Sequence, residues 1–351
     1  MARIKKTDSP FHPSLFGDDN LPTFEPIRKY AQQHSKQDAD PTDSSDQEEP
    51  SLADDPVILN SDMSRHRINF ISFGSGSSGN CSYVGDDTHA FLIDAGIDPE
   101  KIVSRLKEYG ISMTRIAGIF LTHDHGDHVR YAYSILRANR HMKLYCTPKV
   151  MSGLLRRHNI SRRIKDYHQP IYKEFTVNVG RFALTPFEVL HDGTDNAGYF
   201  IQHDGLSMAI ATDLGCISPR VEHYMTQANF IMLESNYDLQ MLMSGSYPDY
   251  LKARIVSQNG HLDNTDAAQF IKRIYTPALR YIFLCHLSKD NNTPQKAIEA
   301  YTNAFDNSGI TLGDGSRELN TDLQLIPLPR FDATPMYTLR MIPRTTPEAK
   351  P

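Results

Sequence analysis

His123-Asp124-His125-Gly126-Asp127-His128 is the stretch that decides the fold, because it sets four potential metal ligands in the pattern His-x-His-x-Asp-His. It follows the apolar run 118–122, which predicts a buried strand that ends in this loop. Neutral imidazole and ionised carboxylate are the usual ligands of zinc and related metals. Four ligands exceed what one tetrahedral ion with an open position needs, so the loop indicates two metal ions. A His-rich surface turn, as in a purification tag, is disfavoured by its attachment to a buried strand.

Composition places the chain among cytoplasmic proteins. Its 351 residues allow one large domain or two smaller ones. No apolar stretch approaches the roughly 18–20 residues that cross a bilayer. The basic start, 1–6, is not followed by the apolar segment of a secretory signal. The four cysteines stand singly beside apolar residues, which predicts reduced core thiols and no disulfide framework.

The net charge of -5 hides two charged segments of opposite sign. Residues 38–62 hold nine acidic residues and no Lys or Arg, and 130–173 hold eleven Lys or Arg against one acidic residue. The acidic segment predicts disorder. The basic segment is a candidate surface for a polyanion, with ordinary solvated helix faces as the alternative. We expect a disordered acidic extension over 1–66, a catalytic domain over 67–306 and a C-terminal extension over 307–351 with edge strands.

Hydrophobic periodicity predicts an alternation of strands and helices. Strands are expected over 68–73, 81–84, 90–93, 118–122, 143–146, 175–179, 182–190, 199–202, 208–211, 230–233 and 281–284, with edge strands over 323–326 and 336–341. Helices are expected over 99–109, 130–138, 148–158, 247–258, 265–274 and 294–305. The segment 74–79 satisfies Gly-x-Gly-x-x-Gly, but a strand-like stretch follows it where a dinucleotide site needs a helix. It reads as a loop able to approach a phosphate, or as a simple Gly-rich connection.

Three further residues stand at the polar ends of apolar runs: His191, Asp213 and His286. Each alone would more often be a satisfied structural residue. Together with the opening loop they form a set of seven candidate metal ligands: His123, His125, Asp127, His128, His191, Asp213 and His286.

With these residues in place the chain resembles the metallo-β-lactamase-fold hydrolases, whose binuclear site has this order of ligands. The resemblance implies an α/β fold, the αββα four-layer sandwich. It also implies two divalent metal ions, Zn or Mn. His123, His125 and His191 would hold one, Asp127, His128 and His286 the other, and Asp213 would bridge them.

Further motifs resemble the YycJ/WalJ family of 5′–3′ exonucleases from about Phe70 to Ala300. They are the Gly-rich segment 74–80, 233–236, 260–264 and 285–288. This resemblance implies a nucleic-acid substrate, DNA in preference to RNA, and no membrane. Similar Glu and Gly-His elements occur in ribonuclease Z, where they assist protonation of the leaving group. Here they would be Glu234 and His261, with a structural histidine at a helix entry as the alternative for His261. Asp127 would manage the nucleophile. Family members usually carry a proline within 191–198, which is absent here.

Two other functions compete with a nuclease. A small-molecule hydrolase of the same fold, a thioesterase or lactonase, would not need the pair Glu234 and His261 or the basic segment. A non-catalytic nucleic-acid-binding scaffold would have no use for seven ligands. The sequence does not decide the metal, DNA against RNA, strand polarity or the oligomeric state.

Overall fold

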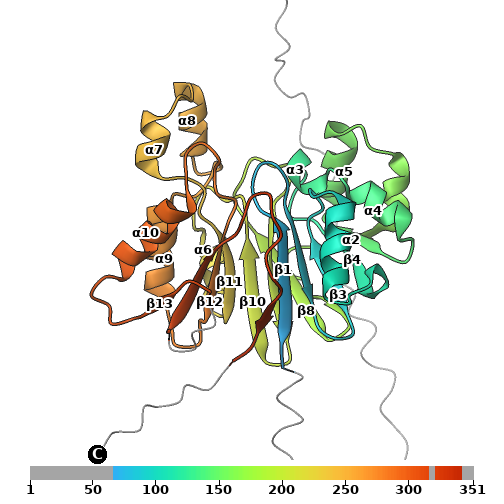
Figure 1. The fold of residues 1–351 in the computed structure, drawn as a ribbon. Coiled ribbons are helices and arrows are strands. Elements are labelled where there is room, and N and C mark those ends of the chain that lie inside the picture. The colour runs from blue at the N-terminus through green and yellow to red at the C-terminus, as the bar shows by residue number, and fades with distance from the viewer. Residues whose placement is uncertain (1–65, 316–320, 342–351) are drawn as a thin grey trace, which may run out of the picture. The chain divides into compact units, whose positions relative to one another are not determined.

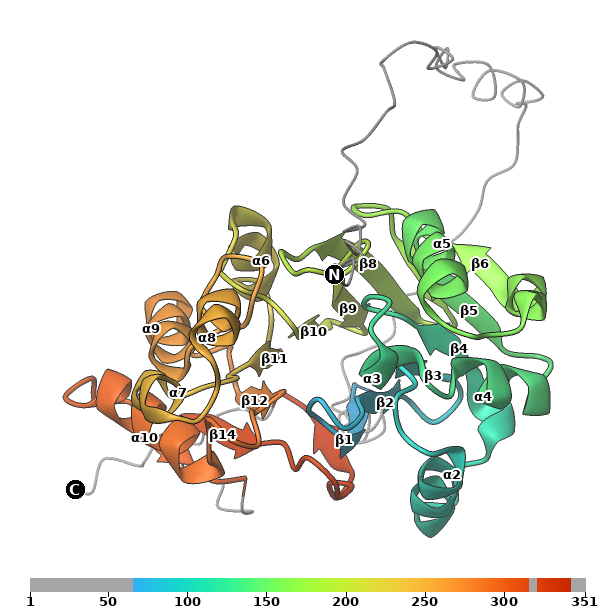
Figure 2. The same ribbon diagram turned by 90° about the horizontal axis from the view of Figure 1, so that it is seen from above.

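Two β-sheets pack face to face between outer layers of helices, as Figure 1 and Figure 2 show. The computed structural model describes residues 66–315 and 321–341, so the extension expected over 1–66 lies outside them except for its last residue. The αββα sandwich expected from the sequence is confirmed. No helix in the described ranges is both long and apolar enough to span a membrane.

The first sheet is built from the N-terminal half of the fold and closed by a late strand. Its described strands, in spatial order, are β15 (Tyr337–Leu339), β1 (Ile68–Gly74), β2 (Cys81–Gly85), β3 (Ala90–Ile93), β4 (Ile116–Phe120), β5 (Lys143–Cys146) and β6 (His168–Pro170). From β3 to β6 neighbouring strands run parallel, so their carboxyl ends meet at one edge.

The second sheet follows the same plan. Its described strands, in spatial order, are β13 (Leu312–Gly313), β14 (Leu323–Pro327), β12 (Tyr281–Cys285), β11 (Phe230–Glu234), β10 (Leu206–Ala211), β9 (Ala197–His203), β8 (Phe182–Glu188) and β7 (Val177–Val179). β10, β11, β12 and β14 are parallel neighbours, so their carboxyl ends also meet at one edge.

The helices form two groups and a pair that stands apart. Beside the first sheet are α2 (Pro99–Glu108), α3 (Gly126–Val129), α4 (Ala132–Ala138) and α5 (Pro148–Arg157), with 3-10 turns at Met113–Arg115 and Arg162–Tyr167. Beside the second are α6 (Pro219–Met225), α9 (Asn264–Ile274) and α10 (Pro294–Phe305). The pair α7 (Leu239–Ser244) and α8 (Asp249–Ile255) lies at the same end of the sandwich as α3 (Figure 1).

Several helices begin in the same way, with a capping side chain followed by proline. In α2 the Asp98 carboxylate accepts from the backbone N–H of Glu100, and Pro99 occupies the first turn, as the sequence predicted. The caps Thr147, Ser218 and Thr293 start α5, α6 and α10 likewise. Proline suits this position because its fixed φ is helical and the N–H it lacks would have no partner there.

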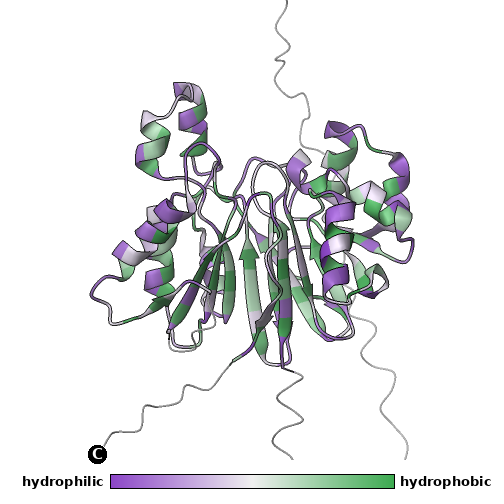
Figure 3. Cartoon of the chain, viewed as in Figure 1, coloured by the Kyte–Doolittle hydropathy of each residue, from purple (hydrophilic) through white to green (hydrophobic). Residues whose placement is uncertain are grey.

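Three apolar layers hold the four structural layers together. The layer between the sheets takes side chains from both, and Phe70 of β1 meets Phe283 of β12 with ring centroids 4.6 Å apart. A second layer joins the first sheet to α2, α4 and α5, and a third joins the second sheet to α6, α9 and α10. In Figure 3 the strands are mainly hydrophobic and the helices carry hydrophilic outer faces. Burial on both faces explains why the strands are almost continuously apolar.

Three expectations need correction. The helix expected over 130–138 is observed as α4, which begins at Ala132 because Tyr131 is not helical, and the short helix α3 within the metal-ligand loop was not expected. α7 was not expected, since Leu242 is its one buried side chain and it lacks a helical apolar stripe. β14 was expected at an edge but lies between β12 and β13, whereas β15 does lie at the edge of the first sheet. Both sheets thus include strands from 307–351.

Candidate metal centre and active site

The candidate site residues gather where the carboxyl ends of parallel strands meet, the usual place for a site in α/β proteins. The loop 123–128 follows β4 of the first sheet. Asp213 follows β10, Glu234 ends β11 and His286 follows β12, three neighbouring strands of the second sheet. All seven sequence-predicted ligands lie within this one region, together with Glu234 and His261.

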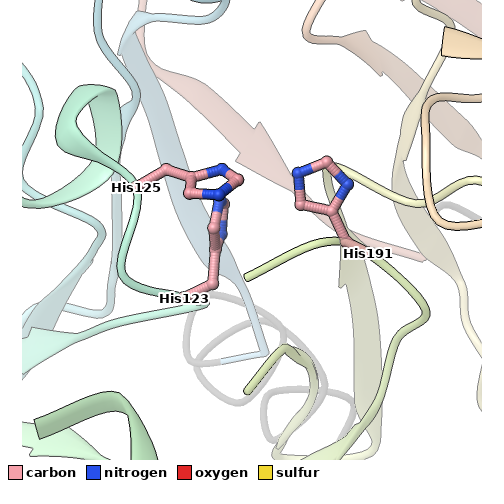
Figure 4. Close-up of side chains that lie close together, drawn as sticks. All are labelled: His123, His125 and His191. Carbon is pink, nitrogen blue, oxygen red and sulfur yellow. The ribbon is translucent and has the colours of Figure 1, made fainter. Parts of the chain in front are cut away.

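His123, His125 and His191 form the first group of candidate ligands (Figure 4). The rings of His123 and His125 are 4.6 Å apart between centroids, and His191 approaches them from the second sheet at 5.3 Å and 5.1 Å. The Nδ1 of His191 donates to the backbone carbonyl of Gly260 at 2.9 Å. That bond fixes the tautomer and leaves Nε2 of His191 for a cation.

Asp127, His128 and His286 form the second group. Asp127 Oδ2 lies 3.6 Å from Nε2 of His128 and 3.6 Å from Nε2 of His286. Asp213 stands between the groups, with Oδ2 3.1 Å from His128 Nε2 and Oδ1 3.9 Å from His191 Nε2. A carboxylate in that position is able to serve two ions at once.

The donor set fits divalent cations. The Nε2 atoms of His123 and His286 are buried and have no hydrogen-bond partner among the described residues, which is unusual for buried polar atoms. Burial and the neighbouring imidazole of His128 lower the pKa of His123 well below its usual value, so this ring is neutral and able to bind a cation. Burial opposes protonation of His128 too, but Asp213 and Asp94 raise its pKa well above the usual value. These carboxylates thus attract positive charge into the site.

Glu234 and His261 form a hydrogen-bonded pair beside the second group. Glu234 is fully buried, and its Oε1 accepts from Nδ1 of His261 and from Nδ1 of His286, each at 2.8 Å. Its Oε2 accepts the backbone N–H groups of Leu214 and Leu262. Burial alone would lower the pKa of His261, but the charge and hydrogen bond of Glu234 raise it. His261 is therefore held in one orientation and favoured in its protonated form.

Two carboxylates at the site were missed as site residues in the sequence. Asp94 is buried after β3 and accepts from Nδ1 of His128 at 2.8 Å. It stands at a strand end, as Asp213 does, and that signal would have found it. Asp192 places Oδ1 3.3 Å from His125 Nε2 and 3.4 Å from His191 Nε2, and Arg254 of α8 donates to its other oxygen. Its position next to His191 was its only signal.

Three of the six described non-glycine residues with positive φ lie in the same region. Asp94, Asp213 and His286 adopt φ angles of 62°, 52° and 53°, a left-handed conformation that costs a non-glycine residue energy. Each directly follows a strand end or lies one residue beyond it. The conformation turns the chain sharply as it leaves the sheet, at the edge where the carboxyl ends of the parallel strands meet.

Part of the basic segment borders the candidate ligands. Arg130 Nη1 donates to the backbone carbonyl of Ser78 at 3.3 Å, Arg156 reaches Thr194, and Arg157 Nη1 lies 3.5 Å from Asp124. Three tyrosines of the segment are partly buried and pack against the first-sheet core: Tyr131, Tyr133 and Tyr167. The segment 74–80 joins β1 to β2 with no helix, which agrees with rejecting a dinucleotide site.

Comparison with known proteins gives consistent matches. Residues 89–286 match the Beta-lactamase superfamily domain. The chain is 29% identical to "Exodeoxyribonuclease YycJ" of Bacillus anthracis, over 73% of this chain and 96% of that protein. It is 30% identical to "Exodeoxyribonuclease WalJ" of Streptococcus pneumoniae, over 72% and 93%. The Zn²⁺-bound PqqB structure from Methylobacterium extorquens aligns with a TM-score of 0.55 at 15% identity, over 78% and 100%, and shares the fold.

Family membership rests on two matches. The domain match spans more than half of the chain, and the WalJ match covers most of both proteins. The chain therefore belongs to the β-lactamase superfamily, as a YycJ/WalJ-like metal-dependent hydrolase with the metallo-β-lactamase fold.

Proposed function

We propose that this protein is a two-metal phosphodiesterase that removes nucleotides from DNA in the 5′-to-3′ direction. The observation that carries the proposal is the 2.8 Å hydrogen bond between Glu234 and His261 beside the candidate ligands. An alkoxide leaving group needs a proton, and this pair supplies a positioned donor. The names of the YycJ and WalJ relatives, exodeoxyribonucleases, support DNA as the substrate.

In this proposal His123, His125 and His191 would hold one ion, Asp127, His128 and His286 would hold the other, and Asp213 would serve both. The His and Asp donors suit Zn²⁺ and Mn²⁺ alike. When bound, the two ions supply Lewis acidity to the phosphate and make a water molecule more acidic.

The protein side chains position the reacting groups. Asp127 is the most exposed carboxylate of the ligand set, at 19% of its side-chain surface, compared with 3% for Asp213. Asn80 Nδ2 donates to its Oδ2 at 3.2 Å, which holds the carboxylate in place. Asp127 is thus positioned to orient the attacking water and take its proton. His261 then donates to the departing sugar oxygen, and Glu234 keeps its ring aligned.

Electrostatics bring the polyanion to the site. Arg130, Arg156 and Arg157 border the ligand loop, and most other basic residues of 130–173 are exposed. Contacts with phosphates release counterions, so the binding constant falls steeply as salt rises.

A cytoplasmic location is part of the proposal. It is supported by the four cysteines, all free in the structure, which suit a reducing compartment.

One assay separates this function from a thioesterase or lactonase. The full chain is loaded with Mn²⁺ or Zn²⁺ and given labelled 5′-phosphorylated DNA, the matching RNA, and a thioester. We expect DNA to be shortened from its 5′ end, and Asp127→Ala to be inactive. Asp166→Ala, at an exposed carboxylate within the basic segment, is the matched control and should retain activity. Thioester cleavage without nuclease activity would overturn the proposal.

A further inference from the structure

A cavity of about 220 Å³ lies between the candidate metal ligands and α8. His191, His261 and His286 line it on the side of the metal ligands, and Leu251, Arg254 and Ile255 of α8 also line it. Further lining residues are Ser77, Asp192, Tyr247 and Ser288. The cavity is smaller than the roughly 300–1,000 Å³ of pockets for drug-sized ligands such as a whole nucleotide. It has room for part of one nucleotide, such as its phosphate group.

Two hydroxyl groups in the lining have protons left to donate to a ligand. The Oγ of Ser77 accepts from Arg330 Nη1 at 3.1 Å, and the Oγ of Ser288 accepts from the backbone N–H of Asn291 at 3.2 Å. A hydroxyl that accepts from the protein keeps its own O–H to donate. Arg330 is half-buried behind Ser77, so its positive charge lies close to that hydroxyl. This part of the cavity is suited to an anion.

The remaining lining fits the rest of a nucleotide. The carboxylate among the lining residues, Asp192, is already paired with Arg254, so it opposes an incoming phosphate less than a free carboxylate would. Tyr247, Leu251 and Ile255 offer an aromatic ring and apolar side chains. Bases pack against such surfaces without regard to their identity, which suits an enzyme that removes successive nucleotides.

The position of His261 indicates which part of the substrate occupies the cavity. Its Nδ1 is engaged by Glu234, so Nε2 is the atom free to donate a proton, and His261 itself lines the cavity. If His261 protonates the leaving oxygen, the leaving group lies there. In an exonuclease that removes one nucleotide at a time, the unit released with that oxygen is the terminal nucleotide.

We propose that this cavity binds the terminal nucleotide of the strand through its 5′-phosphate, with the hydroxyl groups of Ser77 and Ser288 as donors to the phosphate. This inference rests on the proposed nuclease function. In the reaction a water oxygen bonds to phosphorus and its proton passes to Asp127. The bond from phosphorus to the 3′-oxygen of the terminal nucleotide breaks, and His261 protonates that oxygen. The products are a 5′-mononucleotide and a strand with a new 5′-phosphate, ready for the next cycle.

Product binding tests the cavity directly. Calorimetry on the full chain with Mn²⁺ compares deoxyadenosine 5′-monophosphate, deoxyadenosine 3′-monophosphate and deoxyadenosine. We expect the 5′-monophosphate to bind tightest. Ser77→Ala should weaken its binding about tenfold or more, the effect of losing one hydrogen bond to a charged group. Ser78→Ala removes the neighbouring exposed hydroxyl, which does not line the cavity, and should bind as the wild type does.

A second pair of variants tests the space itself. Ile255→Trp should fill the cavity and weaken binding of the 5′-monophosphate at least as much as Ser77→Ala. Val256→Trp adds the same bulk at the next residue, which is 40% exposed and outside the lining, and should leave binding unchanged. Equal binding of the three compounds, preference for the 3′-monophosphate, or wild-type binding by both Ser77→Ala and Ile255→Trp would overturn the inference.

Hydrolysis by the wild type separates this inference from the function on which it rests. If the Mn²⁺-loaded chain cleaves neither DNA nor bis(p-nitrophenyl) phosphate, the proposed function fails. If it degrades strands with 5′-phosphate and 5′-hydroxyl ends at equal rates, the nuclease function stands and the end-binding cavity does not. A preference for the phosphorylated end supports both.

Discussion

Replacement of His261 by alanine should slow the hydrolysis of DNA far more than that of bis(p-nitrophenyl) phosphate. In DNA the departing sugar oxygen needs a proton, whereas p-nitrophenolate leaves as a stable anion and needs little help. The Nδ1 of His261 is held by Glu234, so one ring nitrogen remains for this transfer. If His261 is the proton donor, its loss affects the substrate with the poorer leaving group.

General acid catalysis contributes about 10²–10⁴-fold, which corresponds to about 2.7–5.4 kcal/mol of activation free energy. We expect a loss of that size for DNA and a loss of less than about tenfold for the nitrophenyl ester. The fold should tolerate the change. It removes one hydrogen bond to a buried carboxylate, worth about 1.5–3 kcal/mol, and Glu234 keeps its bonds from His286, Leu214 and Leu262.

The assay measures kcat/KM for both substrates with the wild type, His261→Ala and His223→Ala. His223 is an exposed histidine on α6 and serves as the control. Bound metal is measured in each preparation, since a lost ion would slow both reactions. Equal slowing of the two substrates at full metal content would refute the role of His261 as the proton donor.

Three further outcomes are expected. Removal of metal by EDTA should lower the melting temperature by about 5–10 °C for each occupied site, relative to protein with Mn²⁺ at 100 times its Kd, because binding at that level adds about 2.7 kcal/mol per site. Scanning fluorimetry measures the shift, and an unchanged midpoint would contradict a metal site. Gly96→Ala places Cβ 1.6 Å from the backbone oxygen of Asp127 and should lower the free energy of unfolding by about 3 kcal/mol or more. In Gly126→Ala the new Cβ meets nothing closer than 3.7 Å, so urea unfolding should show a smaller loss. Burial alone would raise the pKa of Asp86, but hydrogen bonds led by the backbone N–H of His89 lower it. The wild type should therefore exceed Asp86→Asn in free energy of unfolding by the full amount above the unfolded pKa of about 4, and this difference should shrink as pH falls through the lower folded pKa. A difference that does not depend on pH would contradict this.

Much of the site was readable in the sequence because its residues stand at the ends of apolar runs. The loop 123–128, Asp213 and His286 all follow strands that are buried on both faces, and such strands are distinct in a sequence. Asp94 has the same placement after β3, but it lies outside the motif of seven candidate ligands. Local sequence showed the ends of strands, not which strand ends converge.

The features missed in the sequence depend on packing between distant segments. α7 buries only Leu242 and lacks a helical pattern, so its place beside the site comes from tertiary contacts. β14 ends at Pro327 and Pro329 follows it, which is typical of an edge strand, yet β13 covers its outer side. The cavity between α8 and the metal ligands likewise brings Ser77, Arg254 and Ser288 together from three separate parts of the chain.

The candidate ligands come from both sheets, and this has a mechanical consequence. His123, His125, Asp127 and His128 belong to the first sheet, whereas His191, Asp213 and His286 belong to the second. Any cation held by this set would cross-link the two sheets at the edge where the ligands lie, and would close a long loop of chain there. When force pulls the two sheets apart, the metal-free protein should separate first at the edge where the candidate ligands lie. The metal-loaded protein should resist separation there.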